Sequence, residues 1–361
     1  MSYQETSFVT HAVHVLSWED DPHAAALRWA LERMGVPVVH SPGLAQWRGD
    51  EVAVEIGLGH AGLSSATDAP ISVWNRRPKA RKPKPSLPED QAFIAGEWRT
   101  FYDNLVEAAA QLLPSFWINT PAAAWRTENK LVQLVAAREI GLAFPETAMG
   151  NDAAAVRRLA QGGRVVFKTF RAHAWQEEGG LSTTTTILDN DHLPDAQVIE
   201  FCPGIYQRYV EKTSDIRVTV AGNRMLAVRM RRRSKEAYVD WRIHVLDEDF
   251  FAEQITLPAA LEQRIQALMA SLGLVFGCLD FVVDADGEYQ FLEVNQAGQF
   301  LFLEDMIPDI GVMRMMASFL AAGSRDYSVV EDATLNMAEF RSTETYAALA
   351  HRLRLDEPAT A

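Results

Sequence analysis

Two carboxylates and one amide lie close together in a C-terminal pair of expected strands. Residues 278–283 and 289–294 read as strands around a glycine-containing turn, which would present Asp280, Glu293 and Asn295 near one another. Mg²⁺ prefers such hard oxygen ligands and keeps positions for phosphate and water. Taken alone, the same pattern is more typical of a structural hairpin.

A lysine inside an apolar strand is a second candidate for binding chemistry. Lys168 stands in the expected strand 165–170, where alternation places it on one face with Val166 and Phe170. A cation among apolar side chains costs free energy unless an anion compensates for its charge. Alternatively, Lys168 is an edge-strand lysine with no binding role. The glycines and hydroxyls of residues 177–184 could wrap a phosphate, or form an ordinary flexible hairpin loop.

Two segments concentrate positive charge. Residues 75–88 combine six Arg and Lys with four Pro, which predicts an exposed, extended loop that is either a solvated linker or a contact surface. Residues 229–235 hold five cations in seven positions. Arg229 and Arg231 share a strand face and are the better candidates to contact a carboxylate or phosphate, as in an acidic peptide. Alternatively, the charges of this hairpin only keep a sheet edge soluble.

Composition limits the classes of function. The 361 residues are 48% hydrophobic, enough for two or three structural units. With 34 Lys and Arg against 48 Asp and Glu, the net charge of −14 disfavours general nucleic-acid binding. No signal peptide or membrane-spanning stretch is expected. Cys202 and Cys278 lack partners at metal-ligand spacing, so we expect two buried thiols in a cytoplasmic protein.

The N-terminal segment has the pattern of an open α/β sheet. A strand at 12–16, a helix at 22–34 and a strand at 36–39 begin a βαβ layout. Apolar runs at 52–56 and 71–74 are expected to continue the same sheet.

Two helices are expected to separate this segment from the candidate site. After a helix at 90–113, Asn119 or Thr120 can cap a helix that starts at Pro121. Helical periodicity over 128–140 then places Lys130 near the beginning of the next helix.

The second half has an α+β pattern that is partly antiparallel. A strand is expected near 205–210, followed by a hairpin of 216–220 with 225–230. After Phe319 we expect at most one amphipathic helix, at 343–353.

The order of these features resembles the ATP-grasp superfamily. A helix-borne lysine, a strand-borne lysine, a Gly/Thr loop, an Asp-Ile-Arg strand, and then Asp and Glu-x-Asn occur in sequence within 119–319. The resemblance implies an N-terminal open α/β domain at 1–115 with central and C-terminal α+β units at 116–204 and 205–325 that clamp ATP. A tail would occupy 326–361.

The resemblance also implies roles around bound ATP and Mg²⁺. The implied residues are Lys130 and Lys168 on the phosphates, Arg208 and Tyr209 beside the adenine, Asp215 near the ribose, Arg217 and Arg242 near the triphosphate or acyl phosphate, and Asp280, Glu293 and Asn295 on Mg²⁺. Related glutamate ligases carry an acidic residue where Arg208 stands, so an adenine contact here would come from the backbone. Phosphoryl transfer needs placed cations and metal rather than a covalent nucleophile.

Within the superfamily, the chain looks most like the microviridin-type, or graspetide, peptide ligases. The similar segments are 73–78, 129–131, 240–242 and 293–304. Those enzymes activate Asp or Glu side chains of a ribosomal precursor peptide as acyl phosphates and join them to Thr, Ser or Lys. The resemblance implies a precursor with a leader and an acidic core as partner, and a homodimer. Residues 296–297 depart from the Pro-Asn that often follows the metal ligands.

Two other functions are compatible with the pattern. The chain could add free amino acids to a protein or small acid, as related glutamate ligases do. It could also be a nucleotide-binding regulatory protein without turnover, but the presence of both lysines and all three metal ligands argues against that reading.

Overall fold

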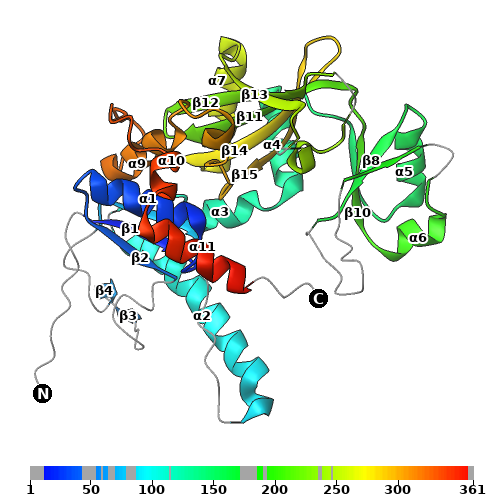
Figure 1. The fold of residues 1–361 in the computed structure, drawn as a ribbon. Coiled ribbons are helices and arrows are strands. Elements are labelled where there is room, and N and C mark those ends of the chain that lie inside the picture. The colour runs from blue at the N-terminus through cyan, green and yellow to red at the C-terminus, as the bar shows by residue number, and fades with distance from the viewer. Residues whose placement is uncertain are drawn as a thin grey trace, which may run out of the picture.

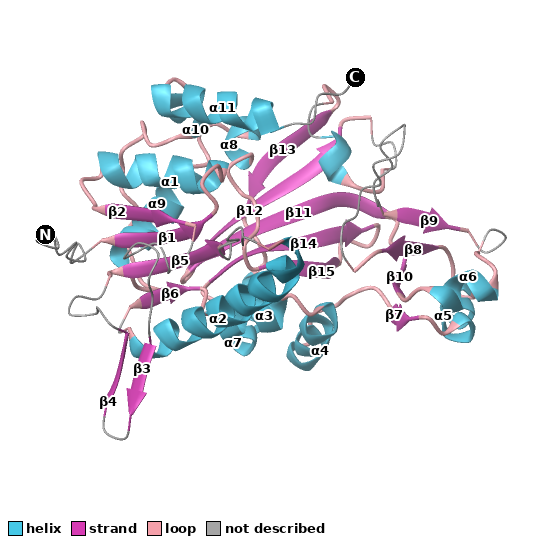
Figure 2. Ribbon diagram, turned by 90° about the horizontal axis from the view of Figure 1, so that it is seen from below, coloured by secondary structure: helices cyan, strands magenta, loops and turns pink. Residues whose placement is uncertain are grey.

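Four groups of strands make up the described part of the chain. The computed structural model describes residues 12–42, 54–57, 60–63, 70–78, 87–113, 115–170, 185–189, 193–234, 238–244 and 247–356. Within these ranges the strands form two four-stranded sheets, one five-stranded sheet and one two-stranded ribbon. Figure 2 shows the five-stranded sheet between the N-terminal sheet and the smaller sheet formed by β7 to β10.

The N-terminal sheet is parallel, with strand order β2-β1-β5-β6. Its strands are β1 (Val13–Ser17), β2 (Val38–Ser41), β5 (Ser72–Arg77) and β6 (Phe116–Ile118). Helix α1 (Pro22–Arg33) connects β1 to β2 and begins where the Asp21 side chain accepts a hydrogen bond from the backbone N–H of His23. The expected βαβ beginning is confirmed.

The apolar run at 52–56 was expected to extend this sheet, and that expectation is wrong for the part of it that the structure describes. β3 (Val54–Gly57) pairs antiparallel with β4 (His60–Leu63) in a separate ribbon. The two edges of β1 are already occupied by β2 and β5, so β3 has no place beside it.

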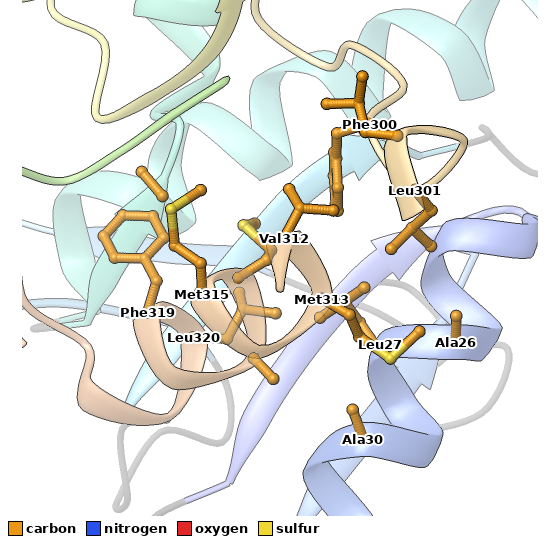
Figure 3. Packing of buried hydrophobic residues seen from close by; sticks show 14 of the residues in the cluster. Ala26, Leu27, Ala30, Phe300, Leu301, Val312, Met313, Met315, Phe319 and Leu320 are labelled. Atoms are coloured by element: carbon orange, nitrogen blue, oxygen red, sulfur yellow. The ribbon is translucent and has the colours of Figure 1, made fainter. Parts of the chain in front are cut away.

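Helices cover both faces of the N-terminal sheet, since β1 is buried along its whole length. α2 (Gln91–Leu112) packs Leu105 against Leu16 on one face. α1 and α9 (Val312–Ala322) pack on the other. Figure 3 shows Met313 of α9 beside Leu27 of α1. A helix from the end of the chain therefore completes the N-terminal core.

The smaller sheet is antiparallel, with strand order β7-β10-β8-β9. Helices α5 and α6 pack on one of its faces, where Val165 and Tyr206 are buried. The elements are β7 (Thr147–Gly150), α5 (Ala153–Ala160), β8 (Val165–Lys168), β9 (Thr186–Leu188), α6 (Ala196–Phe201) and β10 (Gly204–Arg208). The Gly/Thr loop at 177–184 lies outside the described residues.

The five-stranded sheet is antiparallel, with strand order β13-β12-β11-β14-β15. Both hairpins expected from the sequence are confirmed, and the first turns at Gly222, whose φ is 58°. The elements of this region are β11 (Lys212–Ala221), β12 (Arg224–Arg232), the short 3-10 helix η4 (Trp241–His244), β13 (Phe250–Ile255), α7 (Ala259–Leu272), β14 (Phe276–Asp284) and β15 (Tyr289–Asn295).

Two helices lead from the N-terminal sheet to the five-stranded sheet. α3 (Pro121–Thr127) begins at Pro121, and the Thr120 hydroxyl accepts a hydrogen bond from the backbone of its first turn. α4 (Lys130–Ile140) begins after Asn129, whose side chain caps it, and packs against α7 and β15. The expected positions of both helices are confirmed.

The C-terminal region contains more helix than expected. α8 (Leu303–Met306) precedes α9, and both α10 (Met337–Arg341) and α11 (Glu344–Asp356) follow it. The expectation of at most one helix after Phe319 is therefore wrong, because α10 is too short for its periodicity to show in the sequence.

Two further expectations need correction. Cys278 is buried as expected, but Cys202 is exposed at the end of α6. In the basic segment 75–88, residues 75–77 belong to β5 rather than to a loop, and Arg76 is buried. Residues 79–86 lie outside the described part of the chain. Among the residues described, no helix has both the length and the apolar character needed to cross a membrane.

Glu304 holds the starts of two C-terminal helices. Its side chain is buried, and its two carboxylate oxygens accept hydrogen bonds from the backbone N–H groups of Met313, at 2.7 Å, and Met337, at 2.8 Å. Each buried donor left without an acceptor costs about 1–3 kcal/mol. We therefore expect Glu304→Ala to lower the free energy of unfolding in urea by about 2–4 kcal/mol.

The matched control is Glu339→Ala, which removes an exposed carboxylate from α10. It should change the free energy of unfolding by less than about 0.5 kcal/mol. Equal effects of the two substitutions would show that the Glu304 hydrogen bonds contribute nothing specific.

Candidate functional site

A cavity of about 570 Å³ is lined by residues of both the smaller sheet and the five-stranded sheet. Lys168 and Gln207 line it from the smaller sheet, and Asp215, Asp280 and Glu293 line it from the larger one. Its volume falls in the range of small-molecule sites. Most of the residues singled out from the sequence meet here.

Asp280 and Glu293 lie directly opposite each other on β14 and β15, and Arg217 is opposite Asp280 on β11. Opposed residues of an antiparallel pair have Cβ atoms about 4.5–5.5 Å apart, so the three side chains share one face. Arg217 Nη1 donates to both carboxylate oxygens of Asp280 at 2.9 Å. Burial raises the pKa of Asp280, Arg217 opposes this effect, and Glu293 reinforces it.

Glu293 has a different cation beside it. Lys130, at the beginning of α4, forms an ion pair with Glu293 Oε2, and Asn295 Nδ2 donates to Glu293 Oε1 at 3.0 Å. Burial by itself would raise the pKa of Glu293, but the Lys130 ammonium group prevails and lowers it to about 2. Glu293 is therefore ionised at neutral pH, with Lys130 as its counter-ion.

The donor set has the chemistry of a magnesium site shared with a nucleotide. Among the described residues, no three His, Cys, Asp or Glu side chains gather as a metal-binding group. Asp280, Glu293 and the amide oxygen of Asn295 supply two carboxylates and one neutral oxygen. Mg²⁺ is usually held by one or two carboxylates together with substrate phosphates and water, so these residues fit it.

Lys168 faces the cavity with Val166, and Phe170 also lines it. Its ammonium group donates to Gln207 Oε1 at 3.0 Å, and Gln207 in turn donates to Thr147 at 3.0 Å. Burial lowers the pKa of Lys168, which the charge of Glu293 partly offsets. The edge-strand alternative is wrong, because β8 lies between β10 and β9.

The residues expected at the adenine and ribose also line the cavity. However, the Arg208 guanidinium donates to Glu146 at 3.0 Å and to the Gly163 carbonyl at 3.2 Å, so its side chain is already engaged. A contact of Arg208 with adenine would therefore use its backbone. Burial raises the pKa of Asp215, while the adjacent Lys212 opposes that shift.

Lys212 is a cavity residue that the sequence reasoning missed. Its ammonium group lies 2.9 Å from Asp215 Oδ1 and donates to the Val239 carbonyl at 2.8 Å. Residues three apart on a regular strand point to opposite faces. A register shift between Lys212 and Ser214 brings Lys212 to the same side as Asp215, and strict alternation gives no sign of it.

The two arginines predicted to be catalytic occupy different places. Arg242 lines the cavity, is exposed, and donates to Asp240 at 2.9 Å. Arg217 is buried behind Asp280 and is not among the cavity-lining residues. Besides Asp280, it binds the Gln299 carbonyl at 2.7 Å. The predicted contacts of both with a triphosphate stay predictions.

Arg229 and Arg231 are not brought to the cavity. They share a face, as expected, and each lies 3.4 Å from Glu253 on β13. Arg229 is opposite Ile216, the neighbour of Arg217 on β11, so it lies on the reverse face of the sheet from the carboxylates. A substrate contact by this pair would occur outside the cavity.

Gly298 allows the turn after the metal-ligand candidates to approach the sheet closely. A Cβ atom added there would lie 2.5 Å from Cys278 Cβ and 3.1 Å from Arg217 Nη2. The sequence shows the glycine but not this contact. Only a residue without a side chain allows the observed distance between the turn and β14.

Comparison with known proteins identifies the fold to which this site belongs. No protein-family model matches the chain. Two curated relatives, both described as probable alpha-L-glutamate ligases, come from two strains of Vibrio vulnificus. Each is 25% identical over 241 residues, which are 63% of this chain and 75% of the relative.

The solved structures give a fuller match. Macrocyclase MdnC of Microcystis aeruginosa MRC, bound with precursor peptide MdnA, is 23% identical with a TM-score of 0.69, covering 86% of this chain and 99% of that one. A RiPP-associated ATP-grasp ligase of Chryseobacterium gregarium, in complex with ADP and a leader and core peptide, is 20% identical with a TM-score of 0.72, covering 89% and 100%. The chain has the ATP-grasp fold.

This finding confirms the fold predicted from the sequence. D-alanine–D-alanine ligase of Bacillus anthracis also matches the chain, at 12% identity and a TM-score of 0.51 over 88% of this chain and 97% of that one. In this fold, the cavity is lined by residues from two antiparallel sheets, the smaller one and the five-stranded one. The roles of individual residues in it, and the predicted domain boundaries, stay predictions.

Substituting Gly298 tests how closely the turn must approach β14. We expect Gly298→Ala to lower the free energy of unfolding by about 1–3 kcal/mol, because overpacking at a buried site forces its neighbours to shift. Thermal and urea unfolding measure the effect. Gly96→Ala, in α2 with no atom within 4 Å of the added Cβ, should instead be neutral or stabilising by up to about 1 kcal/mol. A neutral Gly298→Ala would contradict the close contact.

Proposed function

We propose that this chain is an ATP-dependent carboxylate ligase that uses Mg²⁺. It would phosphorylate Asp or Glu side chains of a ribosomal precursor peptide and join them to Thr, Ser or Lys, forming ester or amide macrocycles. The observation that carries the proposal is one cavity in which Lys130 and Lys168 lie with Asp280, Glu293 and Asn295. Cations for phosphate and oxygen ligands for Mg²⁺ are what phosphoryl transfer to a carboxylate requires.

The chain's residues would divide this chemistry between them. Bound ATP would supply the phosphoryl group, and Mg²⁺ would neutralise part of the negative charge on its phosphates. Lys130 and Lys168 would bind phosphate oxygens, and Asp280, Glu293 and Asn295 would hold the metal. In this proposal a peptide carboxylate would take the terminal phosphoryl group of ATP with release of ADP. A hydroxyl or amine would then displace inorganic phosphate and lose its proton to solvent, which completes the ester or amide bond. Arg242, exposed at the cavity, could bind the developing charge.

The substrate half of the proposal rests on the neighbours and on charge. MdnC was solved with a precursor peptide, and the Chryseobacterium ligase with a leader and core peptide. On a chain with a net charge of −14, Arg229 and Arg231 form a surface with two positive charges beside the single carboxylate of Glu253. We propose that this surface attracts acidic residues of a precursor from outside the cavity. Because ATP is the cosubstrate, we place the reaction in the cytoplasm.

A second candidate keeps the same cavity and changes the acceptor. The relatives from Vibrio vulnificus are described as probable alpha-L-glutamate ligases. Addition of a free amino acid to a protein or small acid would use the same acyl phosphate. The two activities differ in product mass, since macrocyclisation loses water within one molecule and ligation adds a residue.

Mass spectrometry distinguishes these functions. The enzyme is incubated with ATP, Mg²⁺ and, as the candidate substrate, an acidic, Thr- or Lys-containing peptide encoded beside it. We expect successive losses of one water mass from the peptide, with ADP formed in step. Lys168→Met and Glu293→Gln should each lower the rate by about 10²-fold or more, because each removes charge at the reacting phosphate or its metal.

Arg158→Ala is the control, since it removes an exposed cation from α5.

Arg229→Glu with Arg231→Glu should raise the peptide concentration needed for half-maximal rate and leave ADP binding unchanged. A mass gain with free glutamate would favour the second candidate. ADP binding without any turnover of ATP would favour a regulatory protein.

We also propose that the chain is a homodimer. Figure 1 shows that α2 extends away from the rest of the chain at its N-terminal end. Phe93 on this part of the helix is 69% exposed, and the Phe101 side chain is also exposed. Sedimentation should give twice the chain mass of 40.2 kDa, and Phe93→Ser with Phe101→Ser should shift the equilibrium towards the monomer. A monomer in the unsubstituted protein would refute this.

A further inference from the structure

A buried ion pair links the N-terminal sheet to the turn that follows the metal-ligand candidates. Arg76 Nε, on β5, donates to Asp21 Oδ2 at 2.7 Å. The two side chains are 1% and 2% exposed. Ser17 donates to Asp21 as well, at 2.5 Å. Neither member of the pair lines the cavity, and the proposed function gives the pair no role.

From this pair, the Arg76 guanidinium reaches the turn itself. Its Nη1 lies 3.4 Å from the Ala297 carbonyl oxygen and 3.3 Å from that of Gly298. Arg77 also donates to the Ala297 carbonyl, at 3.4 Å. These bonds are long, but the donor is charged and fixed in position by Asp21.

Side chains hold the backbone of every residue in this turn. Asn119 Nδ2 donates to the Gln296 carbonyl at 3.1 Å, and Arg217 donates to the Gln299 carbonyl at 2.7 Å. His23 Nε2 accepts from the N–H groups of Phe300, at 3.0 Å, and Leu301, at 3.3 Å. With the Arg76 contacts, six consecutive residues are therefore fixed from outside the turn.

The turn is continuous with the metal-ligand candidates. Asn295 ends β15, Glu293 lies two residues earlier, and Gly298 packs against the arginine that binds Asp280. A displacement of the turn would therefore be transmitted to all three oxygen ligands.

A purely structural role explains the ion pair poorly. Burying two charges costs several kcal/mol in desolvation, and apolar side chains of similar volume often stabilise a core as well or better. What an apolar pair lacks is a donor directed at the turn. Outer-shell hydrogen bonds of this kind orient metal ligands and tune the affinity for the metal.

We propose that Arg76, held by Asp21, is a positioning residue for the Mg²⁺-nucleotide site. It fixes the 296–298 backbone and, through it, the orientation of Asn295 and Glu293. The inference rests on the proposed function, because it requires that these residues bind Mg²⁺ with a nucleotide. Arg76 itself does not touch the substrate or the metal.

Calorimetric titration with ADP, in excess Mg²⁺ and in EDTA, distinguishes a positioning role of Arg76 from a purely structural one. The ratio of the two affinities measures the contribution of the metal. We expect Arg76→Met to lower the Mg²⁺-dependent part of the affinity about ten- to hundredfold while the affinity in EDTA stays unchanged. Arg76→Lys, which keeps the charge but not the branched geometry, should recover part of the loss. Arg28→Ala, an exposed arginine on α1, is the matched control.

Each outcome has one meaning. Equal losses with and without Mg²⁺, or no change in Arg76→Met, would overturn the positioning role while leaving the proposed function in place. No binding of ADP by the unsubstituted protein would overturn the proposed function first. If Arg76→Met fails to fold, Arg76→Lys and Asp21→Asn provide the same ratio. Thermal unfolding of each variant confirms that the titrated protein is folded.

Discussion

Asp280 and Glu293 face each other across two neighbouring strands, where their negative charges would repel each other if no cations lay beside them. Arg217 neutralises one carboxylate from within the same sheet, and Lys130 neutralises the other from the start of a helix. The rest of the site depends on this requirement. It is met by Lys130, the first residue of α4, and by Arg217 on β11 beside β14, and the cavity therefore holds charges of both signs that a Mg²⁺-bound polyphosphate could rearrange.

The Arg217–Asp280 ion pair also connects the site to the N-terminal sheet, although that sheet contributes none of the predicted ligands. The turn after Asn295 lies against Arg217 on one side and against Arg76 on the other. Because α9 completes the N-terminal core, the sheet is anchored to the chain that follows the turn. The positions of the metal-ligand candidates thus depend on packing in a sheet that does not itself line the cavity.

Sequence reasoning found the residues whose chemistry conflicts with their surroundings. Lys168 and Glu293 are charged residues in apolar strands. Alternation placed Lys168 on one face with Val166 and Phe170, and the predicted hairpin placed Glu293 beside Asp280 and Asn295. Other residues depended on geometry that alternation does not contain. Lys212 reaches the cavity only through a register shift, and Arg229 lies on the reverse face because strand pairing sets the relative phase of β12 and β14. The run at 52–56 was misplaced because a single sequence does not say which strand edge is free.

Cys202 and Cys278 differ in a way that has a practical consequence. Cys278 is buried beneath Gly298, and burial raises the pKa of its thiol, whereas Cys202 is exposed at the end of α6 on the smaller sheet. A maleimide reagent in solution can therefore reach one cysteine of the folded protein and not the other. The native chain therefore carries its own labelling position at the end of α6, beside the smaller sheet, where a fluorophore can be attached without any engineered cysteine.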